Sequence, residues 1–273
     1  MLSNIFREEV VHLAAKRTML RDNPNITTLV VGSSHGDYGF DPSEVEGSFN
    51  LCFRSQDLKH SYNLYRKISE ECPSITTLVL FYSIFSPGSM IEKSPSSKEV
   101  SVVANEIFDL NLSYEDPSLA ALYTAVRGKF DEIKISLEGH AGFMPRVGKP
   151  FIGSNDVEKR VADHMKLNGR KEALPYLGMI LDLAHALGHR MIIVLSPARS
   201  DYRQHAGAGS DLFSDIGPIV RAQKGREVRI VDLYSFEGFD DRDFGDFDHL
   251  HPLGLGPKIM SRIIRDAVQR PNG

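Results

Sequence analysis

Short runs of apolar and β-branched residues recur along the chain, and each is about as long as a β-strand. Their apolar character is near-continuous instead of alternating, which is typical of strands buried on both faces of a parallel sheet. The runs span residues 26–31, 75–81, 190–195 and 228–233, and residues 48–53 form a weaker fifth run. The pattern therefore predicts a mostly parallel sheet of five strands.

Apolar residues at helical spacing occupy segments between and after these runs. In residues 174–185 they recur at intervals of three and four, and Gly188 then supplies a natural helix end before the next strand. Residues 58–68 and 259–267 show the same periodicity. Strands that alternate with helices predict an α/β protein, folded as a three-layer α/β/α sandwich.

One segment, from about residue 86 to residue 168, breaks this alternation. It contains five prolines and is longer than an ordinary connection between parallel strands. We expect it to be an insertion of helices and irregular segments that caps the sheet and shapes a substrate site. Because no linker composition marks a second domain, residues 1–273 are expected to form one domain.

The composition and charge exclude several classes of protein. The 273 residues include 32 Lys and Arg against 36 Asp and Glu, a formal charge of −4. This balance lacks the basic excess that nucleic-acid binding needs. No apolar stretch approaches the roughly 20 residues of a membrane span, so an integral membrane protein is not expected. Glu8 and Glu9 stand where a secretory signal has its apolar centre, which favours a cytoplasmic protein.

A turn of small residues follows the first predicted strand. Residues 32–36 read Gly-Ser-Ser-His-Gly. Loops at the carboxyl ends of parallel strands open into the crevice where ligands bind, and backbone N–H groups beside an exposed serine can receive an oxyanion. Ser34 is therefore a candidate nucleophile, although serine and glycine are also ordinary residues of tight turns and helix caps.

A second candidate motif lies between the last predicted strand and the last predicted helix. Asp248 precedes His251 by three positions, in an Asp-x-x-His pattern. A carboxylate behind an imidazole fixes its tautomer and stabilises the imidazolium form. The same aspartate-rich stretch also fits a solvated acidic loop. Because Ser34 and His251 both follow strands of one predicted sheet, we expect them to meet at the same edge.

The ordered set of these blocks resembles the GDSL/SGNH hydrolase superfamily, and most closely its branch with bacterial polysaccharide O-acyltransferases. The Gly-x-Ser block is matched by residues 32–34 and the final Asp-x-x-His block by residues 248–251. Residues 49–51 are similar to the block after the second strand, and residues 173–202 to the helix, strand and loop before the last strand. The resemblance covers most of the chain and implies an SGNH/flavodoxin-like fold.

The resemblance implies a catalytic triad of Ser34, His251 and Asp248. Ser34 would attack an acyl carbonyl, His251 would take its proton, and Asp248 would orient His251. An acyl-enzyme would then pass its acyl group to water or to a sugar hydroxyl. The implied function is an O-acetyltransferase or esterase that acts on a carbohydrate.

The oxyanion hole departs from the family pattern. The backbone N–H of Ser34 is the expected first donor, but residues 50–57 contain no glycine where the family has one. Any residue except proline offers a backbone N–H, so Arg54 or Ser55 is expected to supply the second donor. The family's asparagine after the third strand is also missing from residues 81–86.

Several polar residues beside these motifs are candidates for substrate binding. Arginine after a strand suits bidentate recognition of a phosphate or carboxylate, although a solvated loop is the ordinary alternative. No tightly bound cofactor and no metal are expected, and acetyl-coenzyme A is the natural acyl donor for a cytoplasmic enzyme. The candidate substrate-binding residues are His35, Asn50, Ser83, Arg199 and Tyr202.

Two other functions compete with serine-dependent acyl transfer. The missing glycine and asparagine favour a non-catalytic module that keeps the fold for polysaccharide binding or assembly. A metal-dependent phosphoesterase would instead use the oxygen and imidazole ligands that Zn²⁺ or Mn²⁺ accept. Its candidate ligands are Asp246, Asp248, His249 and His251, with His35 and Asp37 as further candidates.

Overall fold

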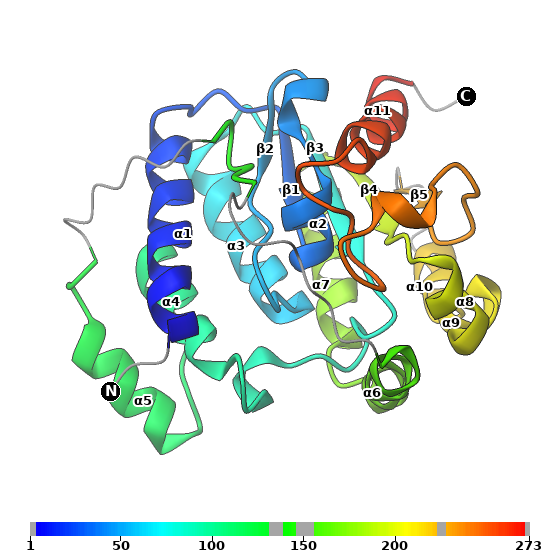
Figure 1. Ribbon diagram of the computed structural model, residues 1–273. Coiled ribbons are helices and arrows are strands. Elements are labelled where there is room, and N and C mark those ends of the chain that lie inside the picture. Colours follow the sequence, from blue (N-terminus) through cyan, green and yellow to red (C-terminus); the bar gives the residue numbers. More distant parts are fainter. Residues whose placement is uncertain (1–3, 131–138, 146–155, 223–227, 271–273) are drawn as a thin grey trace.

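The structure, a computed structural model, describes residues 4–130, 139–145, 156–222 and 228–270. Its centre is a sheet of five strands in the order β2-β1-β3-β4-β5, and every neighbouring pair is parallel (Figure 1). The strands are β1 (Thr28–Val31), β2 (Ser48–Asn50), β3 (Thr77–Tyr82), β4 (Arg190–Leu195) and β5 (Val228–Asp232). All five predicted strands are confirmed, with shifts of a few residues at their ends.

Helices connect these strands, as the alternating pattern predicts. Before and between the first three strands lie α1 (Asn4–Arg21), α2 (Ser34–Gly39) and α3 (Leu58–Glu71). Between β3 and β4 lie α4 (Lys98–Phe108), α5 (Pro117–Val126), α6 (Val157–Arg170) and α7 (Leu174–Ala186). After β4 come α8 (Ser200–Ala206), α9 (Gly209–Leu212) and α10 (Ile216–Ala222), and α11 (Gly256–Gln269) follows β5.

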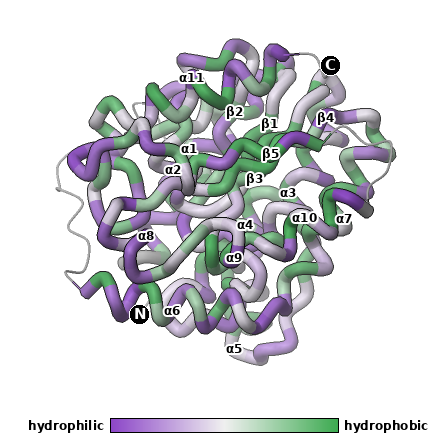
Figure 2. The backbone as a smooth tube through the Cα atoms, turned by 90° about the vertical axis from the view of Figure 1, so that its right-hand side faces the viewer, coloured by the Kyte–Doolittle hydropathy of each residue, from purple (hydrophilic) through white to green (hydrophobic). Residues whose placement is uncertain are grey.

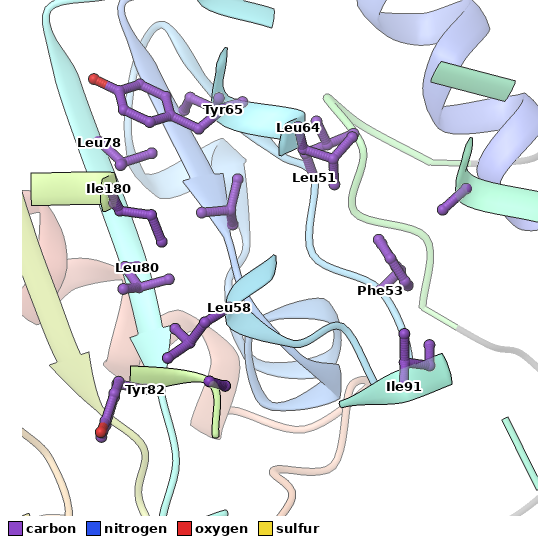
Figure 3. Close-up of a cluster of buried hydrophobic side chains, with 14 of the residues drawn as sticks. Leu51, Phe53, Leu58, Leu64, Tyr65, Leu78, Leu80, Tyr82, Ile91 and Ile180 are labelled. Atoms are coloured by element: carbon purple, nitrogen blue, oxygen red, sulfur yellow. The ribbon is translucent and has the colours of Figure 1, made fainter. Parts of the chain in front are cut away.

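Successive residues of the central strands point to opposite faces of the sheet and enter two separate cores. Along β3, Leu78, Leu80 and Tyr82 pack in the larger core, together with side chains of α1, α3, α4 and α7. Figure 3 shows part of this core, with Tyr65 of α3 and Ile180 of α7 beside β3. Val79 and Phe81 pack in the smaller core with residues of α11 and of the segment after α2. Figure 2 shows the strands as a mostly hydrophobic centre between helices that mix hydrophilic and hydrophobic residues. This layering confirms the predicted three-layer α/β/α sandwich.

The fifth strand differs from its predicted environment. The apolar run 228–233 predicts a strand buried on both faces, but Ile230 of β5 is 41% exposed and Arg229 is partly exposed. The reason is position: β5 pairs only with β4 and forms an edge of the sheet. Apolar runs identify strands more reliably than they distinguish edge strands from central ones.

The predicted insertion contains three of these helices. The segment from about residue 86 to residue 168 includes α4, α5 and most of α6, and its residues 131–138 and 146–155 lie outside the described part. α4 packs against α1, whereas α6 packs against α8 at the far end of the sheet. The assignment of residues 1–273 to one domain stays a prediction.

The strand order places a natural binding crevice at one edge of the sheet. Order 2-1-3-4-5 is that of flavodoxin-like doubly wound folds, in which the connections after β1 and β3 run to opposite sides. The chain is therefore a doubly wound α/β protein. Ser34, Ser83 and Ser196 follow the carboxyl ends of β1, β3 and β4. In the described part of the chain, no helix is long and apolar enough to cross a bilayer.

Candidate active site

Ser34 lies at the first position of α2, directly after a tight turn that only glycine fits. Gly32 has φ +136°, and a Cβ at this position would lie 2.7 Å from Cβ of Phe81 and 2.8 Å from its carbonyl oxygen. The backbone therefore passes against β3 before α2 begins. Ser33 caps the helix with an extended backbone, and its carbonyl accepts the N–H groups of Gly36 and Asp37. The first N–H groups of a helix have no partner within it, which suits them to receive an oxyanion.

Three side chains form a continuous hydrogen-bonded chain at this position. The Ser34 Oγ and the His249 Nε2 are joined by a hydrogen bond of 2.7 Å. The Nδ1 of His249 lies 2.9 Å and 3.0 Å from the two carboxylate oxygens of Asp246. Asp246 and His249 are both buried, whereas Ser34 is partly exposed. This is the geometry of a serine nucleophile, a base and an orienting carboxylate.

The structure therefore changes the pairing expected from the sequence. Ser34 is bonded to His249 and not to His251, whose Nδ1 accepts the backbone N–H of Leu253 at 3.2 Å. The carboxylate hydrogen-bonded to the base is Asp246 and not Asp248. Asp246 Oδ1 also accepts the backbone N–H groups of Asp248 and His249, which curls the loop and sets the carboxylate against its own imidazole. This turn determines that Asp246 pairs with His249, and residue spacing in the sequence does not reveal it.

Asp248 lies inside the site but acts as a second buried charge beside the base. Its side chain is 4% exposed, and its oxygens lie 3.2 Å from His35 Nε2, 3.4 Å from His249 Nδ1 and 3.3 Å from Arg160 Nε. None of these contacts has the geometry of a hydrogen bond. Burial alone would raise the pKa of Asp248, but His249 and His35 hold it well below its usual value. The carboxylate is therefore ionised at neutral pH.

The predicted binding residue His35 lies between the strand ends and the base. Its ring stacks on that of His249 with centroids 4.5 Å apart and planes inclined by 21°. Its Nδ1 lies 3.0 Å from the hydroxyl oxygens of both Ser33 and Ser83. Burial and the neighbouring His249 lower the pKa of His35. A neutral His35 can therefore pack against the His249 ring, and its hydrogen bond with Ser83 fixes His35 to the end of β3.

The base itself has an unusual environment. Burial lowers the pKa of His249, but the two carboxylates Asp248 and Asp246 outweigh it and raise the pKa to about 9. At neutral pH only about 1% of such an imidazole is in the free-base form that can accept the Ser34 proton. The free-base fraction of His249 therefore increases as the pH rises toward 9.

A small pocket opens on the other side of His35. About 210 Å³ of space lies among its lining residues, and part of this space is open solvent. Tyr202, a predicted binding residue, lines the pocket. Its hydroxyl lies 2.8 Å from Nδ1 of His164, and burial lowers the pKa of His164 to about 4. Ser83 also lines it, with its hydroxyl 3.0 Å from that of Ser196. The walls combine aromatic and aliphatic surface with hydroxyl and imidazole groups.

Two predicted binding residues have other contacts in the structure. Asn50 is fully buried, its amide nitrogen donates to the carbonyls of Gly36 and Phe40, and its amide oxygen accepts the N–H of Cys52. It therefore braces the fold and does not face the site. The guanidinium of Arg199 is paired with Asp201 at 2.6 Å and 2.8 Å and lies over the ring of Phe247. Its charge is already neutralised, and Arg199 packs against the loop that carries Asp246 and His249.

The expected second oxyanion donors lie in a turn beside Ser34. The N–H of Phe53 donates to the carbonyl of Gly32 at 3.2 Å, which holds the loop after β2 against the nucleophile turn. Ser55 has a left-handed backbone with φ +61°, and its hydroxyl donates to Ser97. Arg54 and Ser55 are both partly exposed. Their role as oxyanion donors stays a prediction.

Some of the candidate metal ligands of the phosphoesterase alternative have other partners in the structure. Asp37 is bound at 2.7 Å by Lys16 and at 3.1 Å by His12, in a buried cluster that ties α1 to α2. His35, Asp248 and His249 have potential ligand atoms within 4.8 Å of one another. However, both ring nitrogens of His249 are hydrogen-bonded, to Ser34 and to Asp246. A cation at His249 would have to displace one of these hydrogen bonds, so this arrangement favours the serine chemistry.

Two side chains of the site were not singled out from the sequence. Arg160 and His164, on α6, reach Asp246 and Asp248 from the insertion. No sequence spacing connects them with a loop more than eighty positions away. By contrast, Asp246 and His249 form an Asp-x-x-His motif of their own, which overlaps the one at 248–251. Only the structure distinguishes the two frames.

A second serine–histidine–aspartate arrangement shows that such geometry alone does not define a site. His60 bonds to Asp57 through Nδ1 and to Ser101 through Nε2, each at 2.8 Å. Ser101 and His60 have no exposed surface, and Asp57 is the N-cap of α3. This buried set fixes the packing of α3 against α4. Ser34 differs because it is partly exposed at the crevice.

Comparison with known proteins adds little to this picture. No family model matches the chain, and no curated protein matches it in sequence. Among solved structures, the chain is similar to a GDSL-like lipase from Bacteroides thetaiotaomicron, with 13% identity over 94% of this chain and 98% of that chain. The TM-score is 0.42, which establishes neither a common fold nor a common activity. The fold class given above therefore rests on strand order and layering.

Proposed function

We propose that the protein is a serine-dependent esterase or acyltransferase whose nucleophile, base and orienting carboxylate are Ser34, His249 and Asp246. The hydrogen-bonded chain among these three side chains, at the carboxyl end of β1, carries the proposal. The resemblance of the sequence blocks to GDSL/SGNH hydrolases supports it. A non-catalytic module does not account for a partly exposed serine that is hydrogen-bonded to a buried histidine.

The reaction would proceed in two displacements. His249 accepts the Ser34 proton as Oγ bonds to the acyl carbonyl carbon, and the imidazolium is held by Asp246. The tetrahedral oxyanion would be received by the Ser34 backbone N–H and an N–H of Arg54 or Ser55. When the bond to the leaving group breaks, His249 returns the proton to that group. Water or a hydroxyl acceptor then repeats the sequence and releases Ser34.

We further propose that the acyl group is small and that the acceptor is a carbohydrate hydroxyl. Acetyl-coenzyme A is the donor we propose for this transfer. The pocket beside His35 supports a small or flat ligand group, since it combines the Phe85 and Tyr234 rings with the hydroxyls of Ser83 and Ser196. Aromatic faces next to fixed hydroxyls suit the mixed apolar and polar surface of a sugar.

The experiment uses a short-chain chromogenic ester and acetyl-coenzyme A in parallel. Wild-type protein should release the chromophore, and a neutral polysaccharide added with acetyl-coenzyme A should gain acetyl groups if transfer is the function. Ser34→Ala should abolish both reactions, whereas Ser33→Ala, on the neighbouring hydroxyl, should keep the activity measurable. Ester turnover without any acetylated acceptor would assign the esterase. Full activity in folded Ser34→Ala protein would overturn the proposal.

A further inference from the structure

The loop that carries the base contains two buried carboxylates where a serine triad needs one. Asp246 and Asp248, here called the carboxylate pair, both lie within 3.4 Å of Nδ1 of His249. Two anions around one imidazole stabilise its protonated form and oppose its action as a base. Something must balance the second charge if the site is to work.

Helix α6 of the insertion supplies that balance. Arg160 contacts both carboxylates: Nη2 lies 3.3 Å from Asp246 Oδ2, and Nε lies 3.3 Å from Asp248 Oδ1. Its side chain is 34% exposed, so it closes the carboxylate pair from the solvent side. With Arg160 in place and His249 protonated, two positive charges face two negative ones. Without Arg160, protonated His249 would be the positive charge that faces the pair, because the other contacts of Asp248 in the described residues come from His35 and His164.

We propose that Arg160 is a positioning residue that partly neutralises the carboxylate pair and so limits how strongly the pair stabilises the protonated form of His249. This inference rests on the proposed function, because it concerns the same imidazole. It also assigns a role to the insertion, which brings a cation to a catalytic loop far from it in sequence. The fork of a guanidinium suits two carboxylates at once better than an ammonium does.

The other groups that face His249 do not supply this charge. From α2, His35 stacks on the base, and its pKa is lowered by burial. Tyr38 meets the base edge-on. From α6, His164 lies 3.7 Å from Asp248, and burial lowers its pKa to about 4, so it is neutral. From α8, burial raises the pKa of Tyr202, so its hydroxyl is also neutral. Among the described residues facing the carboxylate pair, Arg160 is thus the fixed cation.

The test measures how fast a fluorophosphonate probe labels Ser34 as the pH is varied, together with an NMR titration of the His249 ring. In Arg160→Gln, both midpoints should move upward by about one pH unit, so that labelling at neutral pH slows about tenfold. Arg160→Lys restores a positive charge and should move the midpoints most of the way back. Lys159→Gln, which removes the same charge from the exposed neighbouring position of α6, should leave both curves unchanged.

The outcomes separate this inference from the function beneath it. If wild-type protein is not labelled at Ser34, the proposed function fails, and the NMR titration still reports whether Arg160 controls His249. If Ser34 is labelled but Arg160→Gln has the wild-type midpoints, the role of Arg160 is refuted. That role is also refuted if Lys159→Gln shifts the midpoints as much as Arg160→Gln does. Should Arg160→Gln not fold, Arg160→Met takes its place: an upward shift of about one unit that Arg160→Lys does not show would support the role, and wild-type midpoints in Arg160→Met would refute it.

Discussion

The Ser34 hydroxyl and the His249 imidazole lie 2.7 Å apart although 215 positions separate them in the chain. Two features of the fold bring them together. Ser34 begins α2 at the carboxyl end of β1, and His249 lies in the loop between β5 and α11. Because α2 and α11 pack against each other, the two connections converge at one edge of the sheet. A proton can pass directly between the two side chains.

The choice between the two overlapping Asp-x-x-His frames gives the first prediction. His249→Gln should reduce ester turnover by about 10³-fold or more, because the base of a serine triad is lost. His251→Gln should stay within a few-fold of wild type, since His251 contacts the backbone of Leu253 and not Ser34. Steady-state kinetics at saturating ester, with circular dichroism to verify folding, measure both. The opposite ranking would restore the frame at 248–251.

The second prediction concerns pH. Asp248 and Asp246 raise the pKa of His249 to about 9, so the free base becomes available only as the pH rises through that value. The rate constant kcat/KM should therefore increase from neutral pH and level off above about pH 9. Asp248→Asn removes one of the two anions, and the midpoint should fall toward the ordinary histidine pKa of about 6.5.

At neutral pH, the Asp248→Asn variant should therefore turn over ester faster than wild type, and its Ser34 should be labelled faster, as long as the loop keeps its geometry. A pH profile from about 6 to 10 on both proteins decides the matter. An unchanged midpoint in Asp248→Asn would show that the second carboxylate does not set the basicity of His249.

The third prediction tests the turn that presents Ser34. Gly32→Ala forces a side chain into a left-handed backbone and against Phe81, so it should lower the free energy of unfolding by about 1–3 kcal/mol and displace Ser34. Gly178→Ala is the matched control, because a Cβ there meets nothing within 4 Å and the position lies within α7. It should stabilise the protein by about 0.5–1 kcal/mol. Urea denaturation of both variants compares them. Equal stabilities would argue against a strained turn at Gly32.

The fourth prediction concerns the buried cluster that joins α1 to α2. Lys16 has no exposed surface and binds Asp37 together with the carbonyl oxygens of Asn50 and Cys52. Lys16→Met would remove the ammonium from the buried Asp37 carboxylate, which would keep its contact with His12, and we expect a loss of about 3–5 kcal/mol in unfolding free energy.

The double variant Lys16→Met with Asp37→Asn removes both charges and should recover part of that loss. Denaturant unfolding of the two single variants and the double variant gives the interaction as a double-mutant cycle. Strictly additive losses would mean that the two side chains do not stabilise each other.

Much of the architecture can be predicted from the sequence, because a buried parallel strand appears as a short continuous run of apolar residues. Strand β4 lies at its predicted residues, 190–195, since an apolar run flanked by a helix end at Gly188 has few other structures. The turn at Ser34 could likewise be predicted from small residues after a strand. What the pattern does not contain is the position of a strand within the sheet. Ile230 is as apolar as Ile193, yet it lies at the exposed edge.

The site was harder to predict because the decisive contacts are not local in sequence. Spacing alone fits Asp246 with His249 and Asp248 with His251 equally well. The choice depends on two backbone N–H groups that bond to Asp246 and turn the loop. Asn50 illustrates the reverse error: a polar residue at the carboxyl end of a strand looks accessible, but its amide hydrogen bonds lie within the fold.

Whether Ser34 is the nucleophile can be read from the position at which a fluorophosphonate probe bonds to the folded protein, determined by peptide mass spectrometry at about pH 9. We expect an adduct on Ser34, its loss in His249→Gln, and no adduct on Ser101, whose hydroxyl is bonded to His60 but buried. A folded protein that stays unmodified, or that carries the probe on another serine while Ser34 is untouched, would refute the assignment.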